Sequence, residues 1–347
     1  MMCKFAPSAR RKCYLGLHRQ QGVTLVELMI ALAIGLLVTI AMLKVYVESS
    51  RLYRFNEGLA RVQENGRFAL EFIRRDARVA GFWGCNSDAE PYNGISATSD
   101  AYIDVAAGHI TGTSDDGLNS ADSITFRSAT GSGALVTVDM SGTDDNITVD
   151  SALVTGKAAL ISDCEKGDLF QVTENDGAVL KHGADANISA NLNVAYAAGA
   201  RVYEAQQITY CVADGTGTDE SGKPIPSLRR ADGKGSADAC ETGDELVEGI
   251  QNMQILYGED TDADSDGANG DGTANRYVAI DEENLDPDRI VSVRLSVLAR
   301  SLNNNLTTTP SPYTYPPWVN PPTLTTPADK RLRKVFTTTI TLRNKAR

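Results

Sequence analysis

The first apolar segment of the chain is long enough to cross a membrane. Residues 23–43 are apolar apart from one acid, Glu27, and Lys44 follows them. At about 1.5 Å per residue, roughly 21 helical residues span ~31 Å, which matches the hydrocarbon core of a bilayer. We therefore expect a membrane-spanning helix that contains a single ionisable side chain near its start.

A helical pattern continues beyond the apolar segment. Apolar or small residues recur every three or four positions, which places them on one face of a helix: Leu52, Phe55, Leu59, Val62, Gly66, Ala69 and Ile73. Seven positions are few for an independent coiled coil, so we expect this stripe to pack against the chain's own sheet. Gly81 is a suitable stop signal, which predicts one helix from Val23 to about Ala80. Weak points are expected at its glycines, Gly35, Gly58 and Gly66.

The rest of the chain is typical of β-strands. Short alternating runs are separated by Gly, Ser, Thr, Asn and Asp, as strands and turns require: Ser123–Arg127, Ala134–Met140, Leu169–Thr173 and Val202–Val212. The strongest alternation occurs late, in Ile290–Val297 and Val335–Asn344. The predicted fold class is therefore α+β: a long N-terminal helix packed on an antiparallel sheet, with the two late strands adjacent.

Charge divides the chain into a basic start and an acidic remainder. The net charge is −12. Residues 1–22 carry +5 and contain no acid, from Lys4, Arg10, Arg11, Lys12 and Arg19, so the remainder carries −17. An acidic body repels phosphate backbones, and no nucleic-acid partner is expected. The basic flank of the apolar segment predicts that the N-terminus stays in the cytoplasm and the body is exported.

The position of the apolar segment bears on how the chain is processed. Ala31-Leu32-Ala33 resembles a signal-peptidase site, but it lies in the middle of the apolar run, whereas such sites follow the run. Cleavage before the run, after Gly22, is the other position that offers a small residue.

The cysteines favour disulfides in an oxidising compartment. Cys3 and Cys13 lie in the basic start, and four others lie in the body with no C-x-x-C spacing: Cys85, Cys164, Cys211 and Cys240. Isolated cysteines in an exported body are more typical of disulfides than of zinc ligands. Of the three connectivities, we favour Cys85–Cys164 and Cys211–Cys240, which pair neighbours in sequence. Free buried thiols are the alternative.

An aspartate-rich stretch, residues 260–272, has the beginnings of a calcium loop. Asp262, Asp264 and Asp266 alternate and precede a glycine, as in an EF-hand. The twelfth loop position is Thr273, so the closing bidentate glutamate is missing. Two readings stay open: a looser Ca²⁺ loop joined by Asp260 or Asp271, and a solvated acidic loop without metal. No other cofactor is expected.

Nothing in the sequence indicates an enzyme. His18, His109 and His182 have no ligand or catalytic spacing, and H-E-x-x-H and G-x-S-x-G are absent. Residues 217–223 have the glycine and lysine spacing of a phosphate-binding loop, but Pro224 replaces the hydroxyl residue that binds magnesium. A secreted hydrolase held by a signal anchor is the alternative from a different class.

The segment Gly22-Val-Thr-Leu-Val-Glu27 and the apolar run after it resemble the class III leader of type IV pilins and type II secretion pseudopilins. The resemblance implies that a prepilin peptidase cuts between Gly22 and Val23, that Val23 is then N-methylated, and that Glu27 is needed for assembly. Val23 stands where phenylalanine is usual. An ionised glutamate in hydrocarbon costs several kcal/mol unless it is paired, and the new α-amino group of a neighbouring subunit is a suitable partner.

The whole outline resembles PilW-type minor pilins, which are related to J-type pseudopilins. The residues that carry this are RFALEFIRRDARVAGFWGC at the helix end, Ile161–Thr173, Leu256–Asp262 and the closing TTTITLRN. The division implied is a leader at 1–22, a transmembrane part at 23–43, an amphipathic part at 44–80 and a periplasmic body at 81–347. The function implied is pilus initiation and assembly near the tip of a Gram-negative type IV pilus, in support of twitching motility and adhesion.

The partners implied are other minor pilins and pilins, an adhesin-like tip protein, the prepilin peptidase and the inner-membrane assembly platform. A J-type pseudopilin of a type II secretion system is the closest alternative. Residues 310–327 are rich in proline and aromatic residues. We expect them to form an extended connection between the two late strands, either simply exposed or used to dock another minor pilin.

Overall fold

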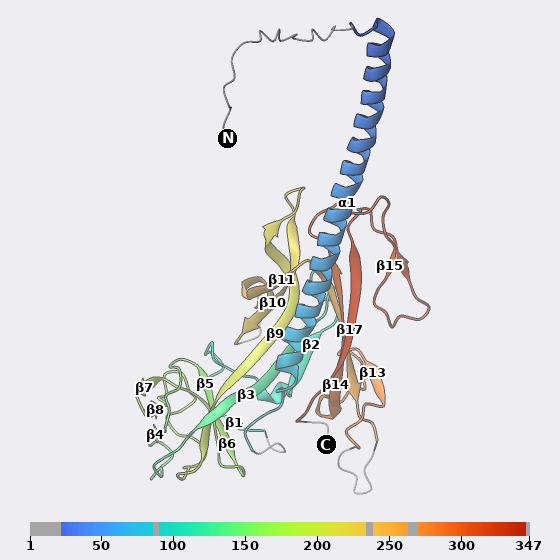
Figure 1. Ribbon diagram of the computed structural model, residues 1–347. Coiled ribbons are helices and arrows are strands. Elements are labelled where there is room, and N and C mark those ends of the chain that lie inside the picture. Colours follow the sequence, from blue (N-terminus) through green and yellow to red (C-terminus); the bar gives the residue numbers. More distant parts are fainter. Residues whose placement is uncertain (1–21, 86–89, 234–238, 263–269, 345–347) are drawn as a thin grey trace, which may run out of the picture. The chain divides into compact units, whose positions relative to one another are not determined.

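The computed structural model describes residues 22–85, 90–233, 239–262 and 270–344. The chain divides into two compact units, residues 1–53 and 54–347, and each is described by itself. In the first unit the described residues are almost entirely the start of helix α1 (Leu25–Ala77), whose side chains up to Tyr53 are nearly all exposed. The second unit holds the rest of α1 and all the strands (Figure 1).

The end of α1 tightens before it stops. The amide of Arg78 still bonds the carbonyl four residues back, whereas the amides of Val79 and Ala80 bond carbonyls only three residues back. Gly81 then has a φ of +75°, a left-handed conformation that glycine adopts without strain. The α-helix therefore ends at Ala77, three residues before the predicted position, while the predicted stop at Gly81 is where the chain turns away.

The larger sheet of the second unit has eight strands. Its main path runs β1 (Tyr92–Asn93), β6 (Gly167–Gln171), β5 (Ala158–Ser162), β9 (Arg201–Thr218), β10 (Pro224–Asp232) and β11 (Asp244–Glu248). In addition, β3 (Ser123–Leu135) pairs with β9, and β2 (Ile110–Thr113) pairs with β3. The pairs are antiparallel except β1 with β6, which is parallel.

A second sheet has four strands, in the order β13 (Arg276–Val278), β12 (Ile250–Glu259), β14 (Ile290–Arg300) and β17 (Arg333–Thr341). The predicted neighbours β14 and β17 pair antiparallel over nine residue pairs, from Ser292 with Thr341 to Arg300 with Arg333. That prediction is confirmed. The α+β fold class is confirmed as well, and the strands divide between this antiparallel sheet, the larger one and two small ones.

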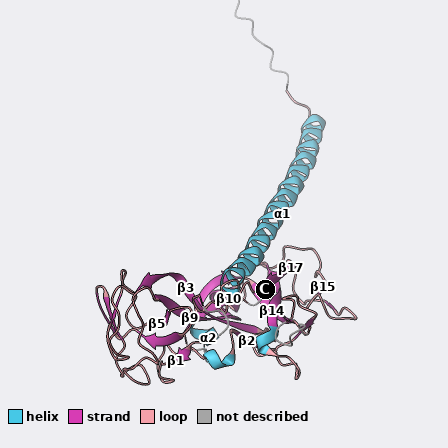
Figure 2. Cartoon of the chain, turned by 90° about the horizontal axis from the view of Figure 1, so that it is seen from below, coloured by secondary structure: helices cyan, strands magenta, loops and turns pink. Residues whose placement is uncertain are grey.

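The remaining elements are short. A three-stranded sheet contains β4 (Ile147–Thr148), β8 (Val179–Lys181) and β7 (Glu174–Asp176). The short helices are η1 (Val105–Ala107), α2 (Ala239–Thr242) and η2 (Pro287–Arg289). Apart from α1, the second unit is mainly strands and connecting loops (Figure 2).

One predicted strand was largely wrong. Of Ala134–Met140, only the first two residues belong to β3. After a single bridge between Val136 and Val149, the amide of Thr137 bonds the carbonyl of Thr148 in β4, and the amide of Met140 bonds the carbonyl of Tyr196 in a loop. Apolar alternation alone does not reveal that the partner strand has ended.

The second part of α1 is buried against both sheets. Its buried face includes Val62, Gly66, Ala69, Leu70 and Ile73. The same apolar cluster contains Phe126 and Tyr210 from the larger sheet and Val293, Leu295 and Ile340 from the smaller one. A Val, Leu, Ile or Phe side chain of this cluster contributes about 1.5–3 kcal/mol to stability when it is fully buried. The predicted stripe is therefore the packing face, except that Leu52 is 60 % exposed and Phe55 and Leu59 are half-buried.

The proline-rich segment folds back on the smaller sheet. It forms a two-stranded ladder, β15 (Tyr313–Thr314) with β16 (Leu324–Thr325). The hydroxyl of Tyr315 donates to the carbonyl of Ser296 on β14 at 2.8 Å, and the guanidinium of Arg333 lies 5.6 Å from the ring centre of Tyr313. The segment connects β14 and β17 as expected, but Tyr313 and Tyr315 are half-buried and anchored to the body rather than simply exposed.

Gly66 allows the closest approach between α1 and β17. A Cβ atom at this position would lie 2.3 Å from ring carbons of Phe336. We predict that Gly66→Ala lowers the free energy of unfolding by about 1–3 kcal/mol, because overpacking exceeds the gain in helix propensity. Thermal or denaturant unfolding of the full chain in detergent measures this.

Gly35→Ala is the matched control. It is also a helical glycine, but no atom lies within 4 Å of the added Cβ. Unfolding of the body should not weaken in this variant. Equal behaviour of the two variants would contradict the packing argument.

Candidate functional site

The predicted cleavage site lies just before α1 and is open to solvent. No atom lies within 4 Å of a Cβ built on Gly22, and Val23 is 68 % exposed. The helix begins two residues later, at Leu25. The peptide bond between Gly22 and Val23 is therefore outside regular structure, where a peptidase can reach it. The preceding leader, which holds Cys3 and Cys13, lies outside the described residues.

Thr24 caps the start of the helix and sets the position of Glu27. The hydroxyl of Thr24 accepts a hydrogen bond from the amide of Glu27 at 3.3 Å, and the carbonyl of Thr24 accepts from Leu28 at 3.1 Å. Threonine followed three residues later by glutamate is the capping-box pattern, which satisfies amides that have no partner inside the helix. No hydrogen bond or ion pair of the Glu27 carboxylate occurs within the part of the chain that the structure describes. The carboxylate is therefore free to meet another group.

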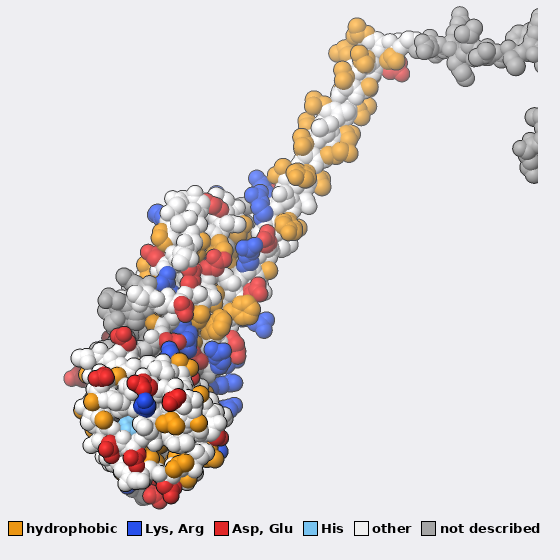
Figure 3. Space-filling view, turned by 90° about the vertical axis from the view of Figure 1, so that its left-hand side faces the viewer, with side chains coloured by type: hydrophobic (Ala, Val, Ile, Leu, Met, Phe, Trp, Pro, Cys, Tyr) orange, Lys and Arg blue, Asp and Glu red, His pale blue; other side chains and the backbone are white. Residues whose placement is uncertain are grey.

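The helical turns that follow Glu27 expose a continuous apolar surface. Every large apolar side chain of residues 28–47 is well exposed, including Leu36 at 63 % and Leu37 at 67 %. Figure 3 shows hydrophobic side chains, in orange, along this part of the helix. By length and composition, α1 is able to cross a membrane. So large an apolar surface is stable only against lipid or other helices. Glu27 therefore lies at the edge of a surface that must be covered.

Two disulfides secure the body. Cys85 joins Cys164 with Cα atoms 4.7 Å apart, and Cys211 joins Cys240 at 5.8 Å. This is the pairing favoured from sequence order. The first bond links the chain just after α1 to the turn between β5 and β6, 79 residues away in sequence. Such cross-links stabilise mainly by restricting the unfolded chain.

A polar cluster that the sequence did not reveal fixes the end of α1. Asp76 is 5 % exposed and accepts the hydroxyl of Tyr210 at 2.6 Å and the guanidinium of Arg230 at 3.3 Å. Arg230 also pairs with Asp232 at 2.6 Å. This network joins the last helical turn to β9 and β10. The only sequence signal was an acid three residues after Ile73, close to the apolar face.

The aspartate-rich loop brings three of its carboxylates together. Ligand atoms of Asp260, Asp262 and Asp271 lie within 4.8 Å of one another. Asp260 is buried, and its oxygens accept the amides of Asp262 at 3.1 Å and Gly272 at 2.7 Å. Asp264 and Asp266 lie outside the described residues. Carboxylates at this spacing have the oxygen chemistry that Ca²⁺ prefers.

The segment with phosphate-loop spacing is a tight turn between β9 and β10. Asp219 accepts the amide and the hydroxyl of Ser221 at 2.9 and 2.6 Å and the amide of Lys223 at 3.1 Å. Its other oxygen pairs with the buried Arg331 at 2.9 Å. The backbone donors that would hold a phosphate are thus occupied by a carboxylate. These bonds, first those from Ser221, lower the pKa of Asp219 to about 2.

The two described histidines make structural contacts. The indole nitrogen of Trp83 lies 3.2 Å from Nδ1 of His109, and Nε2 of His182 lies 2.9 Å from the carbonyl oxygen of Asp145. His182 is 4 % exposed and stacks edge-on against Phe170. His18 lies in the leader, outside the described residues. Neither described histidine is presented to substrate in a catalytic arrangement.

Two family models match the start and the end of the chain. The family model described as Type IV Pilus-assembly protein W matches residues 209–344, and the Prokaryotic N-terminal methylation motif matches residues 17–43. The first match runs from β9 to β17, and the second contains Gly22, Val23 and Glu27. No curated protein matches the chain.

Among solved structures, the chain is similar to the type IV-like pilin TTHA1219 from Thermus thermophilus. The two are 14 % identical, and the alignment covers 83 % of this chain and 99 % of the other. The TM-score is 0.35. A likeness at that level carries no argument, so the fold rests on the helix and sheets described above.

The turn at Asp219 generates a pH prediction. Because its folded pKa of about 2 lies below the unfolded value of about 3.9, its contribution to stability is complete above pH ~4 and is lost as the pH falls toward 2. Asp219→Asn should lower stability at neutral pH and flatten the loss of stability between those two pH values. Denaturant unfolding across this range measures it, with the exposed Asp185→Asn as control. Identical pH profiles for Asp219→Asn and the wild type would contradict the assignment.

Proposed function

We propose that the chain is a PilW-type minor pilin that initiates and helps to assemble a type IV pilus, near the tip and beside other minor pilins. The observation that supports this most is the start of α1. An accessible Gly22–Val23 bond, a capped helix and a Glu27 carboxylate without a partner among the described residues precede an exposed apolar surface. Proteins of this family are structural subunits, which supports an assembly role over an enzymatic one.

The proposed mechanism begins with cleavage between Gly22 and Val23. Cleavage creates an α-amino group at Val23, which is then methylated. Glu27 lies four residues further along, or about 6 Å along the helix axis. When a neighbouring subunit docks, its terminal amine meets the Glu27 carboxylate, and both charges are neutralised in apolar surroundings. Because an ionised carboxylate in hydrocarbon is costly, this contact fixes the axial register of the incoming helix.

The proposed location changes during assembly. Before assembly the chain is a single-pass protein of the inner membrane, with the basic start in the cytoplasm and the body in the periplasm. Afterwards residues 23–43 move from lipid into the helical core of the pilus, and the body reaches the cell surface. The prepilin peptidase, the inner-membrane assembly platform, other pilins and an adhesin-like tip protein are the partners this route requires.

A J-type pseudopilin shares the same start and is the second candidate. The match of β9–β17 to the pilus-assembly family and the aspartate-rich loop favour the pilus. Deletion of the gene separates the two. Loss of surface pili and twitching supports the pilus role, whereas loss of exoprotein export with normal pili supports the secretion role. A hydrolase would show activity that does not depend on Glu27.

We also propose that the aspartate-rich loop binds Ca²⁺ weakly after export. The support is the convergence of Asp260, Asp262 and Asp271, whose mutual repulsion a divalent cation would relieve. Extracellular calcium modules have dissociation constants of about 10⁻⁴–10⁻³ M. A pilus subunit exposed to the medium would meet such concentrations.

Substitution of Glu27 tests the assembly mechanism. In Glu27→Ala we predict that the chain is made, cleaved and inserted, but that its recovery in sheared pili falls at least about ten-fold, which is the effect of ~1.4 kcal/mol. Immunoblots of sheared pili and membranes measure it. Glu48→Ala, an exposed helical acid beyond the apolar segment, is the control. Normal recovery of Glu27→Ala in pili would contradict the mechanism.

Calcium binding is tested by thermal unfolding. At ten times the dissociation constant, Ca²⁺ should stabilise the wild-type chain by about 1.4 kcal/mol, which raises Tm by a few degrees. Asp262→Ala and Asp271→Ala should reduce this rise, whereas the exposed Asp185→Ala should not. No effect of Ca²⁺ on the wild type would remove the proposal.

A further inference from the structure

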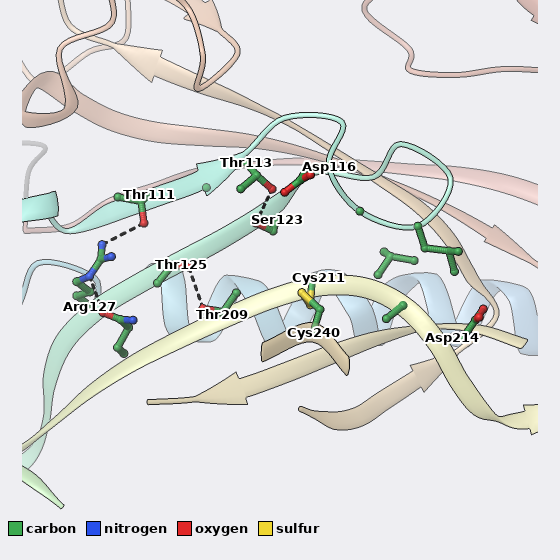
Figure 4. Close-up of a pocket in the computed structure, with 16 residues that line it drawn as sticks. Thr111, Thr113, Asp116, Ser123, Thr125, Arg127, Thr209, Cys211, Asp214 and Cys240 are labelled. Carbon is green, nitrogen blue, oxygen red and sulfur yellow. Dashed lines mark hydrogen bonds between the residues drawn. A yellow bond between two sulfur atoms is a disulfide. The ribbon is translucent and has the colours of Figure 1, made fainter. Parts of the chain in front are cut away.

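A groove lined by both polar and apolar residues lies on the face of the larger sheet that points away from α1. Along β3, Ile124 and Phe126 face the apolar core, so the alternate residues Thr125 and Arg127 face outward. On β9, Thr209 lies between core residues in the same way. These outward side chains form the floor of a groove of about 840 Å³, between β2 and the Cys211–Cys240 disulfide (Figure 4). This volume is within the range of ligand sites.

The floor of the groove offers unused hydrogen-bonding capacity. The hydroxyl oxygens of Thr125 and Thr209 lie 2.8 Å apart, and those of Thr113 and Ser123 lie 2.9 Å apart. In each pair one hydroxyl donates to the other, so the second keeps its hydrogen for an outside acceptor. The described lining residues include no aromatic side chain. Leu118, Val212 and Ala213 line the groove as well, so it offers apolar contacts beside these hydroxyls, a combination that suits a peptide.

Arg127 places a buried positive charge at one end of this groove. It is 5 % exposed, and burial lowers its pKa. Its guanidinium donates from Nε to Gln207 at 2.8 Å, and from Nη1 to the carbonyl of Gly108 at 3.0 Å and to Thr111 at 3.1 Å. These acceptors are neutral. Among the described residues no carboxylate lies within ion-pair distance, and Nη2 has no acceptor; Asp104 acts on Arg127 only at longer range.

The opposite end of the groove is acidic. Asp116 and Asp214 line it and are exposed (Figure 4). A carboxylate is therefore attracted to the Arg127 end and repelled from the other. A buried arginine without an anionic partner is costly, and an incoming carboxylate both removes that cost and forms charge-assisted hydrogen bonds.

We propose that this groove binds an extended, polar peptide segment through a carboxylate that lies against Arg127. The hydroxyl pairs hydrogen-bond the peptide backbone, and a basic group further along the segment lies near Asp116 and Asp214. The source of this segment is another pilus subunit, an assignment that rests on the proposed function. The groove and its charge gradient belong to the body, so binding in the groove is separate from the Glu27 contact.

The carboxylate site is tested by titration with acetate. The full chain, ¹⁵N-labelled at arginine and held in detergent, should give an Arg127 Nε–H signal that is assigned by its loss in Arg127→Lys. We expect this signal to shift and saturate in the millimolar range of acetate, with no such shift in sodium chloride of equal ionic strength. An unchanged signal, or the same shift in chloride, would overturn the carboxylate site.

Thr125→Val combined with Thr209→Val is the matched variant. Replacing both partners of a hydrogen bond by groups of the same shape is nearly neutral for folding, so the body should melt as the wild type does. The peptide is expected to lose contacts here, while acetate at Arg127 should bind within about two-fold of wild type. Loss of acetate binding in this correctly folded variant would contradict the placement of the anion at Arg127.

The source of the peptide is tested by photo-crosslinking in piliated cells. A benzoylphenylalanine at the groove rim, in place of Thr113, should crosslink to another pilus subunit through a segment that carries Asp, Glu or a C-terminus. The yield should fall at least five-fold in the Thr125→Val, Thr209→Val background. The same probe at Thr339 on β17 is the control. No product, a product shared with the control, or a product outside the pilus would overturn the subunit as ligand.

The two proposals fail in different ways. If the chain proves dispensable for pili while acetate still saturates the Arg127 signal, the assembly role fails and the carboxylate site stands. If Glu27→Ala blocks assembly but neither acetate nor the Thr113 probe finds a ligand, the groove proposal fails and the assembly role stands.

Discussion

The proposed assembly of this chain depends on one carboxylate, that of Glu27, at the start of an apolar helix. An ionised acid in hydrocarbon is unfavourable by several kcal/mol, so it persists only where a partner relieves it. The structure leaves this carboxylate without a described partner and caps the helix with Thr24 instead. The amine that would pair with it does not exist until the bond after Gly22 is cut. In the proposed mechanism, processing and assembly are thereby coupled by the same electrostatic requirement.

The body is held firmly against the second part of α1. Three kinds of contact do this within residues 54–347: close apolar packing at Gly66 and Phe336, the buried Asp76 network, and the Cys85–Cys164 disulfide just after the helix. Each acts at a different level, through dispersion, charge-assisted hydrogen bonds and chain entropy. The face of the larger sheet that points away from α1 carries the groove that we propose binds a further subunit.

Local patterns in the sequence were sufficient for the helix and for several strands. The three-and-four spacing around Val62 and Ile73 identified the packing face, and strict alternation identified β14 and β17, because both signals are contained in short stretches. The division into two sheets and the parallel pairing of β1 with β6 were not predictable. They depend on which distant segments meet, and periodicity carries no information on that.

The same distinction applies to the candidate sites. Gly22, Val23 and Glu27 form one contiguous motif, so the sequence alone was enough to single them out. Asp76 and Arg127 gain their meaning from residues more than a hundred and about eighty positions away, respectively. In the sequence Arg127 ends a short alternating run and resembles an ordinary solvated arginine. Only the pairing of β3 with β9 buries it beside Gln207.

The pairing of Glu27 with a processed terminal amine is tested by the mass of the N-terminal peptide of the chain recovered from pili. The account predicts a peptide that starts at Val23 and carries one N-methyl group, and an uncut chain in cells without the prepilin peptidase. A mature chain that starts at Met1 or after Ala33 would contradict it, because the amine that Glu27 requires would then be missing or displaced.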